Sequence, residues 1–450
     1  MQSTLLHNYG EARLPRYTSY PTAPLFSAAI DKNAYADWLS ALSANEPISL
    51  YLHVPFCRSM CWYCGCHTTI SGRDEPIASY LEVLRREIEM VASQLGRRQP
   101  VKYVHFGGGT PTIMKPAQFI SLIDLLRDRF DVVEDAELAI EIDPRTITRE
   151  MLAALQESGI NRASLGVQTF DPKVQQSINR IQSLECTAET VAGLRRAGVQ
   201  RINFDLIYGL PNQTVRSCVE TVTTALTMKP DRLAVFGYAH VPDIKKHQRL
   251  IDSKALPDSS TRIEQTVAIA DTLVAAGYRQ IGLDCFAIPD DELGKAQTTR
   301  RLRRNFQGYT SDDCDVLVGF GASAIGKTKS GYVQNEVVIG NYSARILGGE
   351  FATARGYNLT IEDRARAAII ERLMCDFEVN ITEICARYGL DQAGLIDGNQ
   401  RLSRALDEGL AEMDDGTIRI QSDHRFLVRV VAASFDAYLE RSPRTHSKAV

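Results

Sequence analysis

Short apolar runs alternate with amphipathic stretches along the first two thirds of the chain. The apolar runs predict strands at residues 48–56, 101–106, 138–142, 163–167, 202–207 and 233–238. Apolar residues at helical spacing follow them, as in residues 80–95 and 119–126. Strands that alternate with helices form parallel sheets with right-handed crossovers. Six such units are too few for a closed eight-stranded barrel, so the pattern predicts an α/β fold, an open and partial (β/α)6 barrel.

Two further parts flank this barrel. Residues 15–23 read PRYTSYPTA, and their prolines disfavour a helix interior or a central strand, so residues 1–45 form either an ordered arm or a floppy tail. Beyond residue 355 the pattern predicts helices at 361–373, 381–388, 402–410 and 426–439, with a hairpin across 414–416. The predicted division is an arm at 1–45, a barrel with additional strands at 46–355, and a mainly helical, winged-helix-like domain at 356–450 that ends in a frayed tail.

Composition narrows the classes of function. The chain has 450 residues, a formal net charge of −4 and a sequence pI near 6.1, so its charge does not indicate a nucleic-acid or anionic-membrane partner. Acidic and basic residues are evenly mixed beyond residue 355, which argues against DNA binding. We find no secretory segment and no run of about eighteen apolar residues, which predicts a cytoplasmic protein without membrane insertion.

Three cysteines directly follow the first predicted strand. Cys57, Cys61 and Cys64 have the spacing C-x3-C-x2-C, with which three thiolates can hold a cubic iron–sulfur cluster and leave its fourth iron open. A structural zinc site is the weaker alternative, because no second C-x2-C pair follows, and a disulfide framework is weaker still. Cys66 is too close to Cys64 to be an obvious fourth ligand and is expected only to shape the loop. The other six cysteines are scattered, as expected of reduced core thiols.

Polar or glycine-rich groups end each predicted strand. Because the carboxyl ends of parallel strands meet at one edge of a sheet, we expect these groups to lie together there. Each is weak evidence alone: glycine-rich loops are mostly turns, a strand-end aspartate is often a helix cap, and His53 or His240 is more often structural than catalytic. The strand-end groups are the cysteine turn, residues 107–111, Glu141, Gln168, Asp205 and residues 238–240.

Two patterns between residues 300 and 328 can be interpreted either as ligand-binding sites or as ordinary structural features. The run Arg300-Arg-Leu-Arg-Arg304 is either a solvated basic face, which is the favoured interpretation, or a clamp for carboxylates, for which arginine is well shaped. Residues 321–328 match the phosphate-loop pattern G-x4-G-K-[ST], but the residues after them are a poor helix start. We therefore do not expect a nucleotide triphosphate site there.

Taken together, these motifs resemble those of the oxygen-independent coproporphyrinogen III dehydrogenases, the HemN family of radical S-adenosylmethionine (SAM) enzymes. The cysteine spacing alone resembles only the superfamily signature, whereas the other motifs extend the resemblance over nearly the whole chain. The motifs are PRYTSYPTA at 15–23, SLYLHVPFC with the following cysteines at 49–66, HFGGGTPT at 105–112, IEIDPR at 140–145, GVQTF at 166–170, DLIYGLP at 205–211, DRLAVFGYAH at 231–240 and NFQGYT at 305–310.

The resemblance implies a 4Fe-4S cluster and two SAM molecules per chain, one of them bound to the open iron. It makes Cys57, Cys61 and Cys64 the cluster ligands. The first SAM would be held by Tyr51, Tyr63, Gly108, Glu141, Ala239 and Ile325. The second SAM would be held by Gly109, Thr110, Gln168, Arg180 and Asp205. No side chain needs to act as a catalytic acid or base, because the radical is generated at the cluster-bound SAM.

The implied reaction is the oxidative decarboxylation of two propionates of coproporphyrinogen III to vinyl groups, which gives protoporphyrinogen IX. A reductant protein such as flavodoxin or ferredoxin is implied, and we expect a monomer. One alternative is a HemW-like haem chaperone, against which Cys66 and the PRYTSYPTA segment argue. Another is a different radical SAM enzyme that acts on a tetrapyrrole. The basic run is denser than the family pattern requires, which leaves the substrate contacts open.

Overall fold

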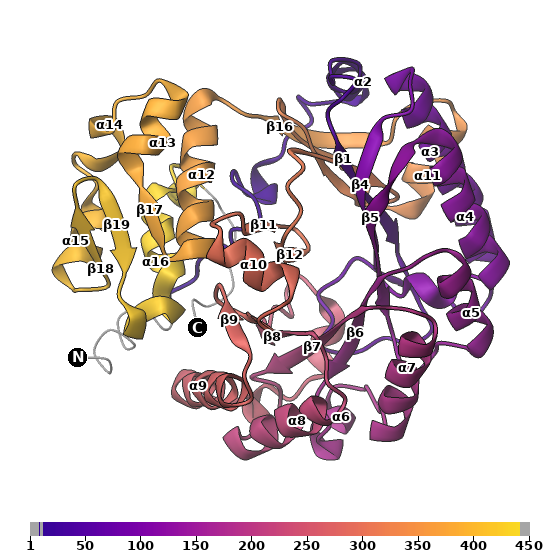
Figure 1. The fold of residues 1–450 in the computed structure, drawn as a ribbon, viewed down its shortest axis with the longest axis horizontal. Helices are drawn as coiled ribbons and strands as arrows, with labels where there is room; N and C mark the ends of the chain where they lie inside the picture. Colours follow the sequence, from indigo (N-terminus) through magenta and orange to yellow (C-terminus); the bar gives the residue numbers. More distant parts are fainter. Residues whose placement is uncertain (1–8, 10–11, 442–450) are drawn as a thin grey trace.

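The computed structural model describes residue 9 and residues 12–441 (Figure 1). Six parallel strands form the centre of its large sheet in the order in which they occur along the chain. The prediction of six strands and an open barrel-like sheet is confirmed. The strands are β1 (Ile48–Val54), β4 (Pro100–Gly108), β5 (Asp131–Ile142), β6 (Arg162–Gln168), β7 (Arg201–Tyr208) and β8 (Arg232–Gly237).

Further strands extend the sheet at both edges. β13 (Val316–Phe320) adds a parallel strand beside β1, which the sequence pattern did not assign to the barrel. Antiparallel strands follow outward, so the sheet order runs from β16 to β9 and these two end strands are not paired with each other. The outer strands are β14 (Ile325–Lys327), β15 (Gly331–Asn335) and β16 (Thr353–Asn358) on one side, and β10 (Cys285–Ala287) and β9 (Arg279–Ile281) on the other.

Helices cover the outside of this sheet and bury its apolar face (Figure 1). Several begin where a side chain caps the first turn: the Ser183 hydroxyl accepts a hydrogen bond from Cys186 N, and the Asp258 carboxylate accepts one from Thr261 N. Phe106 and Leu84 are fully buried between strand and helix, and burying each such side chain contributes about 1.5–3 kcal/mol. The helices are α3 (Glu75–Leu95), α4 (Pro116–Arg129), α5 (Arg149–Glu157), α6 (Pro172–Ser177), α7 (Leu184–Arg196), α8 (Val215–Thr227), α9 (Ser259–Ala275), α10 (Glu292–Thr298) and α11 (Ile339–Leu347).

The PRYTSYPTA segment is an ordered arm. Tyr17 and Tyr20 are buried against the C-terminal part of the chain, where Tyr17 Oη donates to Asp436 Oδ2 at 3.1 Å and Tyr20 Oη accepts from Ala437 N at 3.0 Å. Arg16 Nη2 donates to Gly237 O at the end of β8, at 2.8 Å. The alternative of a floppy tail is therefore wrong for residues 15–23. Helix α2 (Lys32–Ser40) follows the arm and packs on α3.

The C-terminal part has the predicted helices and hairpin, with one correction. The predicted continuous helix at 426–439 is wrong: α16 spans only Val428–Ala432 between two 3-10 segments, and Asp436 is extended, with its carboxylate engaged by Tyr17. The predicted tail begins at Arg441, and its residues from 442 onward lie outside the described residues. The domain limits remain a prediction. The other elements are α12 (Ile361–Asp376), α13 (Ile381–Tyr388), α14 (Ala393–Ile396), α15 (Gln400–Asp407), β17 (Glu378–Asn380), β18 (Ala411–Asp414) and β19 (Thr417–Ile420).

The residues that match the phosphate-loop pattern form the turn and second strand of a β hairpin. β14, which contains Lys327, leads into β15 rather than into a helix. The hairpin turn is instead held by the buried carboxylate of Glu87 on α3, which accepts from Gly321 N at 2.7 Å, Asn335 Nδ2 at 2.7 Å and Tyr342 Oη at 2.8 Å. Burial raises the pKa of Glu87 to about 7, even though these three donors oppose the shift.

This buried carboxyl predicts a pH-dependent loss of stability. Between the ordinary glutamate pKa near 4.5 and about 7, the unfolded chain ionises while the folded chain holds the proton, so stability falls as pH rises through that window. Glu87→Gln removes this loss, and its thermal midpoint relative to the unsubstituted protein should rise between pH 5 and pH 8. The matched control is Glu157→Gln on the exposed end of α5, whose relative midpoint should stay constant. Equal pH trends in both variants would contradict the assignment.

Candidate active site

The cysteine turn lies at the carboxyl edge of the parallel strands and is held there by loops from other units. Its backbone is fixed on one side by the segment after α6, where Trp62 N donates to Ile178 O at 2.9 Å and Asn179 Nδ2 donates to Met60 O at 2.8 Å. On the other side, the chain after β8 contributes His247, whose Nε2 lies 2.7 Å from Cys64 O. The turn is closed by pairing of β2 (Phe56–Cys57) with β3 (Thr69–Ile70).

The thiols of this turn are free and differ in their donors. Cys57 Sγ lies 3.3 Å from Thr68 Oγ1 and 3.4 Å from Thr110 Oγ1. Cys64 Sγ accepts from Cys66 N at 3.4 Å, and a hydrogen bond from the Cys66 thiol lowers the pKa of Cys64, which favours the thiolate that binds iron.

The cysteines of the turn do not form a compact single-ion site. A tetrahedral zinc site with Zn–S bonds of about 2.3 Å would bring its sulfurs within about 4 Å of one another. Among the described residues, the group whose ligand atoms lie within 4.8 Å is Asp312, Asp313 and Cys314, and the cysteines of the turn do not form such a group. As placed, the thiols of the turn therefore do not form a tight single-metal site.

Gly107, Gly108 and Gly109, here called the glycine rim, lie next to the turn. A Cβ at Gly109 would come within 2.6 Å of Phe56 O, so only glycine allows this close approach. Gly108 N donates to Glu141 Oε2 at 3.1 Å, and His105 Nε2 lies 3.3 Å from Glu141 Oε1. Burial alone would raise the pKa of Glu141, but the hydrogen bond and charge of His105 outweigh it and lower the pKa. The glycine rim and Glu141 thus present backbone and carboxylate groups next to the cysteines.

Asp205 forms a second polar group inside the barrel. Its carboxylate accepts from Ser164 Oγ at 2.9 Å and from Asn203 Nδ2 at 2.8 Å. Burial, and to a smaller extent the charge of Glu141, raises its pKa to about 6. Gln168 ends the neighbouring strand with φ 69°, a left-handed conformation that turns the chain over the same edge.

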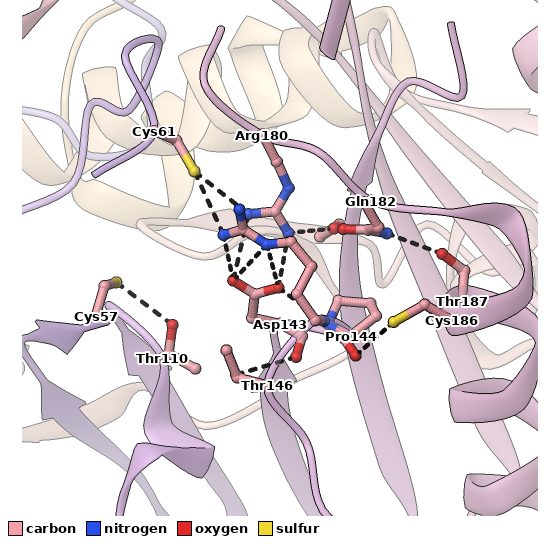
Figure 2. A network of polar contacts seen from close by, with 12 residues as sticks. Cys57, Cys61, Thr110, Asp143, Pro144, Thr146, Arg180, Gln182, Cys186 and Thr187 are labelled. Atoms are coloured by element: carbon pink, nitrogen blue, oxygen red, sulfur yellow. Dashed lines mark hydrogen bonds and ion pairs between the residues drawn. The ribbon is translucent and has the colours of Figure 1, made fainter. Parts of the chain in front are cut away.

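An arginine pair joins Cys61 to the end of β5 (Figure 2). Arg145 Nη2 and Arg180 Nη1 donate to Cys61 Sγ at 3.6 and 3.5 Å. Asp143 lies between the two guanidinium groups and pairs with both. Arg180 Nε is buried without a hydrogen-bond partner among the described residues, so this arginine keeps one donor for a further group.

Most of the predicted site residues meet at this edge. Tyr51 Oη lies 3.0 Å from His53 Nδ1, and Tyr63 O accepts from Gln248 Nε2 at 3.0 Å. Ala239 and Ile325 follow β8 and begin β14, and in the described chain no hydrogen bond links either of them to the cysteine turn. Their roles, like those of the other site residues, remain predictions. Sequence reasoning missed Asp143, Arg145 and His105, although the phrase Asp-Pro-Arg directly after a strand was a usable signal.

A cavity of about 420 Å³ opens beside the turn, at the carboxyl ends of β7 and β8. Asp284 is the one carboxylate among the described residues that line it. Burial, followed by the nearby charges of Arg16 and Arg304, lowers the pKa of Arg429 to about 10. The lining arginines are Arg13, Arg16, Arg262, Arg304 and Arg429, which come from the arm, the barrel and the C-terminal part.

The arginines of the basic run at 300–304 do not all follow one interpretation: some form a solvated face, and one lies where it could bind carboxylates. Arg300 and Arg301 are exposed, and Arg300 pairs with Glu378 at 2.8 Å, as expected of a solvated face. Arg304 instead lines the cavity, where its guanidinium lies over the Tyr309 ring, 4.3 Å from the ring centroid, and 3.5 Å from Asp284.

Comparison with known proteins agrees with this arrangement. A family model described as the radical SAM superfamily matches residues 51–225. The chain is 57% identical over 450 residues to an oxygen-independent coproporphyrinogen III oxidase of Bradyrhizobium diazoefficiens, with all of both chains covered. It is 43% identical to the oxidase of the same name from Pseudomonas aeruginosa, over 94% of this chain and 93% of that one.

A solved structure shares the whole fold. The coproporphyrinogen III oxidase HemN of Escherichia coli, described as a radical SAM enzyme, matches with a TM-score of 0.90 and 37% identity over 94% of this chain and 98% of that chain. The chain belongs to the oxygen-independent coproporphyrinogen III oxidases. The family predicted from the motifs is therefore confirmed, and the named relatives are oxidases rather than haem chaperones.

Members of this radical SAM family use a 4Fe-4S cluster and SAM, and the residues described above fit both groups. The free thiols of the turn suit the cluster, while the glycine rim and the unused donor of Arg180 suit a ligand that carries amino, carboxylate and ribose groups. Among the described residues, no helix is both long and apolar enough to span a bilayer.

The cysteine assignment predicts a sharp difference within the turn. Alanine at Cys57, Cys61 or Cys64 should abolish cluster binding, because each removes one of three thiolate ligands. Cys66→Ala should keep a full four-iron complement and serves as the matched control. Iron and sulfide quantification after anaerobic reconstitution measures both. A full complement in any of the first three variants would contradict the ligand assignment.

Proposed function

We propose that this family member catalyses oxygen-independent oxidative decarboxylation of two propionate side chains of coproporphyrinogen III to vinyl groups, which gives protoporphyrinogen IX for haem biosynthesis. The substrate follows from the names of the relatives, and the arginine-lined cavity beside the cysteine turn is the structural observation that carries the proposal. The proposal requires a site that accepts a tetrapyrrole with four propionates next to the cluster.

The cavity has the chemistry for such a substrate. Guanidinium groups bind carboxylates with paired hydrogen bonds, and five arginines are among the residues that line the cavity. Val235, Ile269 and Leu283 add apolar walls that suit pyrrole rings. The arginines also keep the bound propionates ionised, and the ionised carboxylate is the form that loses carbon dioxide.

The cavity and the cysteine turn share one wall. Ala239 and Val241 line the cavity, and Gln248 joins this segment to the turn, since its Oε1 accepts from Val241 N at 2.6 Å and its Nε2 donates to Tyr63 O at 3.0 Å. When bound, the cluster and SAM supply the one-electron chemistry that removes a hydrogen atom from the propionate β-carbon. The protein's own part is to hold the propionate against that site and to exclude water.

For the cofactors we keep the residue roles that the motifs imply. Cys57, Cys61 and Cys64 hold the cluster. The first SAM is assigned to Tyr51, Tyr63, Gly108, Glu141, Ala239 and Ile325. A second SAM is assigned to Gly109, Thr110, Gln168, Arg180 and Asp205. The buried Nε of Arg180 supports a further ligand on that side.

We also propose that the protein is a monomer, which size-exclusion chromatography tests, and that it is cytoplasmic, which cell fractionation tests. We propose a reductant protein such as flavodoxin or ferredoxin, and anaerobic reduction assays test whether it reduces the cluster.

An anaerobic assay tests the reaction and the cavity together. The reconstituted protein, given dithionite, SAM and coproporphyrinogen III, should release a product that has lost two carboxyl groups in steps, together with 5′-deoxyadenosine. Arg304→Gln should raise KM for the porphyrinogen about 10-fold or more, because a charge-assisted hydrogen bond contributes about 1.5–3 kcal/mol. Mass spectrometry and steady-state kinetics measure these outcomes.

The control for this assay is Arg301→Gln, which removes an exposed arginine of the same basic run outside the cavity and should leave KM within about twofold. Cleavage of SAM while the porphyrinogen keeps all its propionates would refute the proposed substrate. An unchanged KM in Arg304→Gln would refute the proposed place of binding.

The second SAM predicts a binding stoichiometry. The reconstituted protein should bind two SAM per chain in equilibrium dialysis, and Asp205→Ala should bind one, because the ribose hydroxyls of the second molecule lose their acceptor. Glu157→Ala, on the exposed surface of α5, should still bind two. A single SAM in the unsubstituted protein would rule out the second site.

A further inference from the structure

Two guanidinium groups converge on the sulfur atom of Cys61 (Figure 2). Arg145 Nη2 lies 3.6 Å and Arg180 Nη1 lies 3.5 Å from Cys61 Sγ. Their side chains are only 18% and 7% exposed. Both distances are within the range of an N–H···S hydrogen bond, so one thiol of the turn accepts from two cationic donors.

Asp143 fixes both arginines. Its carboxylate accepts from Arg145 Nη2 at 2.6 Å and from Arg145 Nε at 2.9 Å, which is a bidentate pair. It also accepts from Arg180 Nη2 at 3.3 Å. Burial raises the pKa of Asp143, but the hydrogen bonds of Arg145 and the charge of Arg180 outweigh it and hold the pKa below its usual range.

The backbone around this network is anchored as well. Pro144 O accepts from Cys186 Sγ at 3.0 Å, which ties the end of β5 to the start of α7. Arg180 follows the segment whose Asn179 binds Met60 O, so the residue that supplies one donor is attached to the turn that carries the acceptor. The geometry is therefore set by the fold rather than by a mobile side chain.

The other two thiols have neutral donors. Cys57 is contacted by the hydroxyls of Thr68 and Thr110, and Cys64 by the backbone N–H and thiol of Cys66. Among the described residues, Cys61 is the cysteine of the turn whose sulfur accepts hydrogen bonds from arginine side chains. Two guanidinium groups and one carboxylate leave one net positive charge beside that sulfur.

We propose that Arg145 and Arg180 donate hydrogen bonds to the cluster-ligating Cys61 sulfur and raise the reduction potential of the cluster, with Asp143 as their positioning residue. This rests on the proposed function, because it requires a cluster at Cys57, Cys61 and Cys64. A reduced cluster carries one more negative charge, so a positive charge and N–H donors at a ligand sulfur stabilise the reduced form more than the oxidised form. Hydrogen bonds to sulfur and net charge are known determinants of such potentials.

The test is a redox titration of the reconstituted protein, without substrate or SAM, followed by electron paramagnetic resonance. Arg145→Gln should reduce the equilibrium constant for one-electron reduction at least about tenfold, which corresponds to a potential about 59 mV more negative. Arg145→Lys keeps the charge but loses the planar fork, and should give an intermediate shift.

Arg58→Gln is the matched control. Arg58 directly follows Cys57 but donates to Ser71 O and pairs with Asp74, with no recorded bond to a sulfur. Its removal deletes a nearby charge without deleting a sulfur donor, so its potential should stay close to that of the unsubstituted protein. An unchanged potential in Arg145→Gln at full iron content, or an equal shift in Arg58→Gln, would overturn the proposal.

A measurement on the unsubstituted protein covers the case in which the variants lose their cluster. With 15N-labelled arginine, pulsed electron paramagnetic resonance of the reduced, SAM-free protein should show 15N coupling to the cluster spin, and its absence would overturn the proposal. Cluster binding and arginine coupling to the cluster are measured separately. Failure to bind a cluster at all refutes the proposed function, whereas a bound cluster without arginine coupling refutes only the assigned role of Arg145 and Arg180.

Discussion

The cysteine turn is held in place by hydrogen bonds from segments far away in the sequence, and the rest of the site depends on this attachment. The ten residues from Cys57 to Cys66 have no fixed shape alone, because each ordered residue costs about 1–2 kcal/mol of backbone entropy. The bonds from Ile178 and Asn179 on one side and from His247 on the other offset that cost. They can form only because parallel strands bring their carboxyl ends to one edge.

Buried positive charge is used twice at this edge, for two different purposes. Beside Cys61, two arginines share one aspartate, and the resulting hydrogen bonds fix a rigid geometry around a sulfur atom. In the cavity, five arginines and one aspartate are among the lining residues, and burial, followed by the charges of Arg16 and Arg304, lowers the pKa of Arg429. The first arrangement is largely complete within the protein, whereas the second is an arginine-rich lining that suits an anionic ligand.

The arm and the C-terminal part complete the cavity together. The arm's tyrosines are buried against the C-terminal core, while Arg16 reaches the end of β8. Arg429 from α16 and Arg304 from β11 (Arg303–Asn305) enter the same space. A substrate held there would contact three segments of the chain that lie more than one hundred residues apart, so binding and the relative placement of these segments are linked.

The class of fold, and the position of the cysteine turn directly after the first strand, could be predicted from the sequence. The alternation of apolar runs with helical stretches gave six strands in the right order, because strand and helix periods are local properties of the chain. The cysteine spacing and the glycine rim were also readable, since both lie within short contiguous segments. The same kind of local prediction was wrong at residues 426–439. There Asp436, whose carboxylate accepts a hydrogen bond from the distant Tyr17, is extended rather than helical.

Which side chains meet depends on how the chain packs in three dimensions. The pairing of Arg145 and Arg180 with Asp143 and Cys61 joins residues up to 119 positions apart, and no periodicity marks such a contact. Arg304 and Arg300 look alike in one basic run, yet Arg304 lines the cavity at the ends of β7 and β8, whereas Arg300 is exposed and pairs with Glu378. Burial and charge neighbourhood separate them, and both arise only when distant segments pack together.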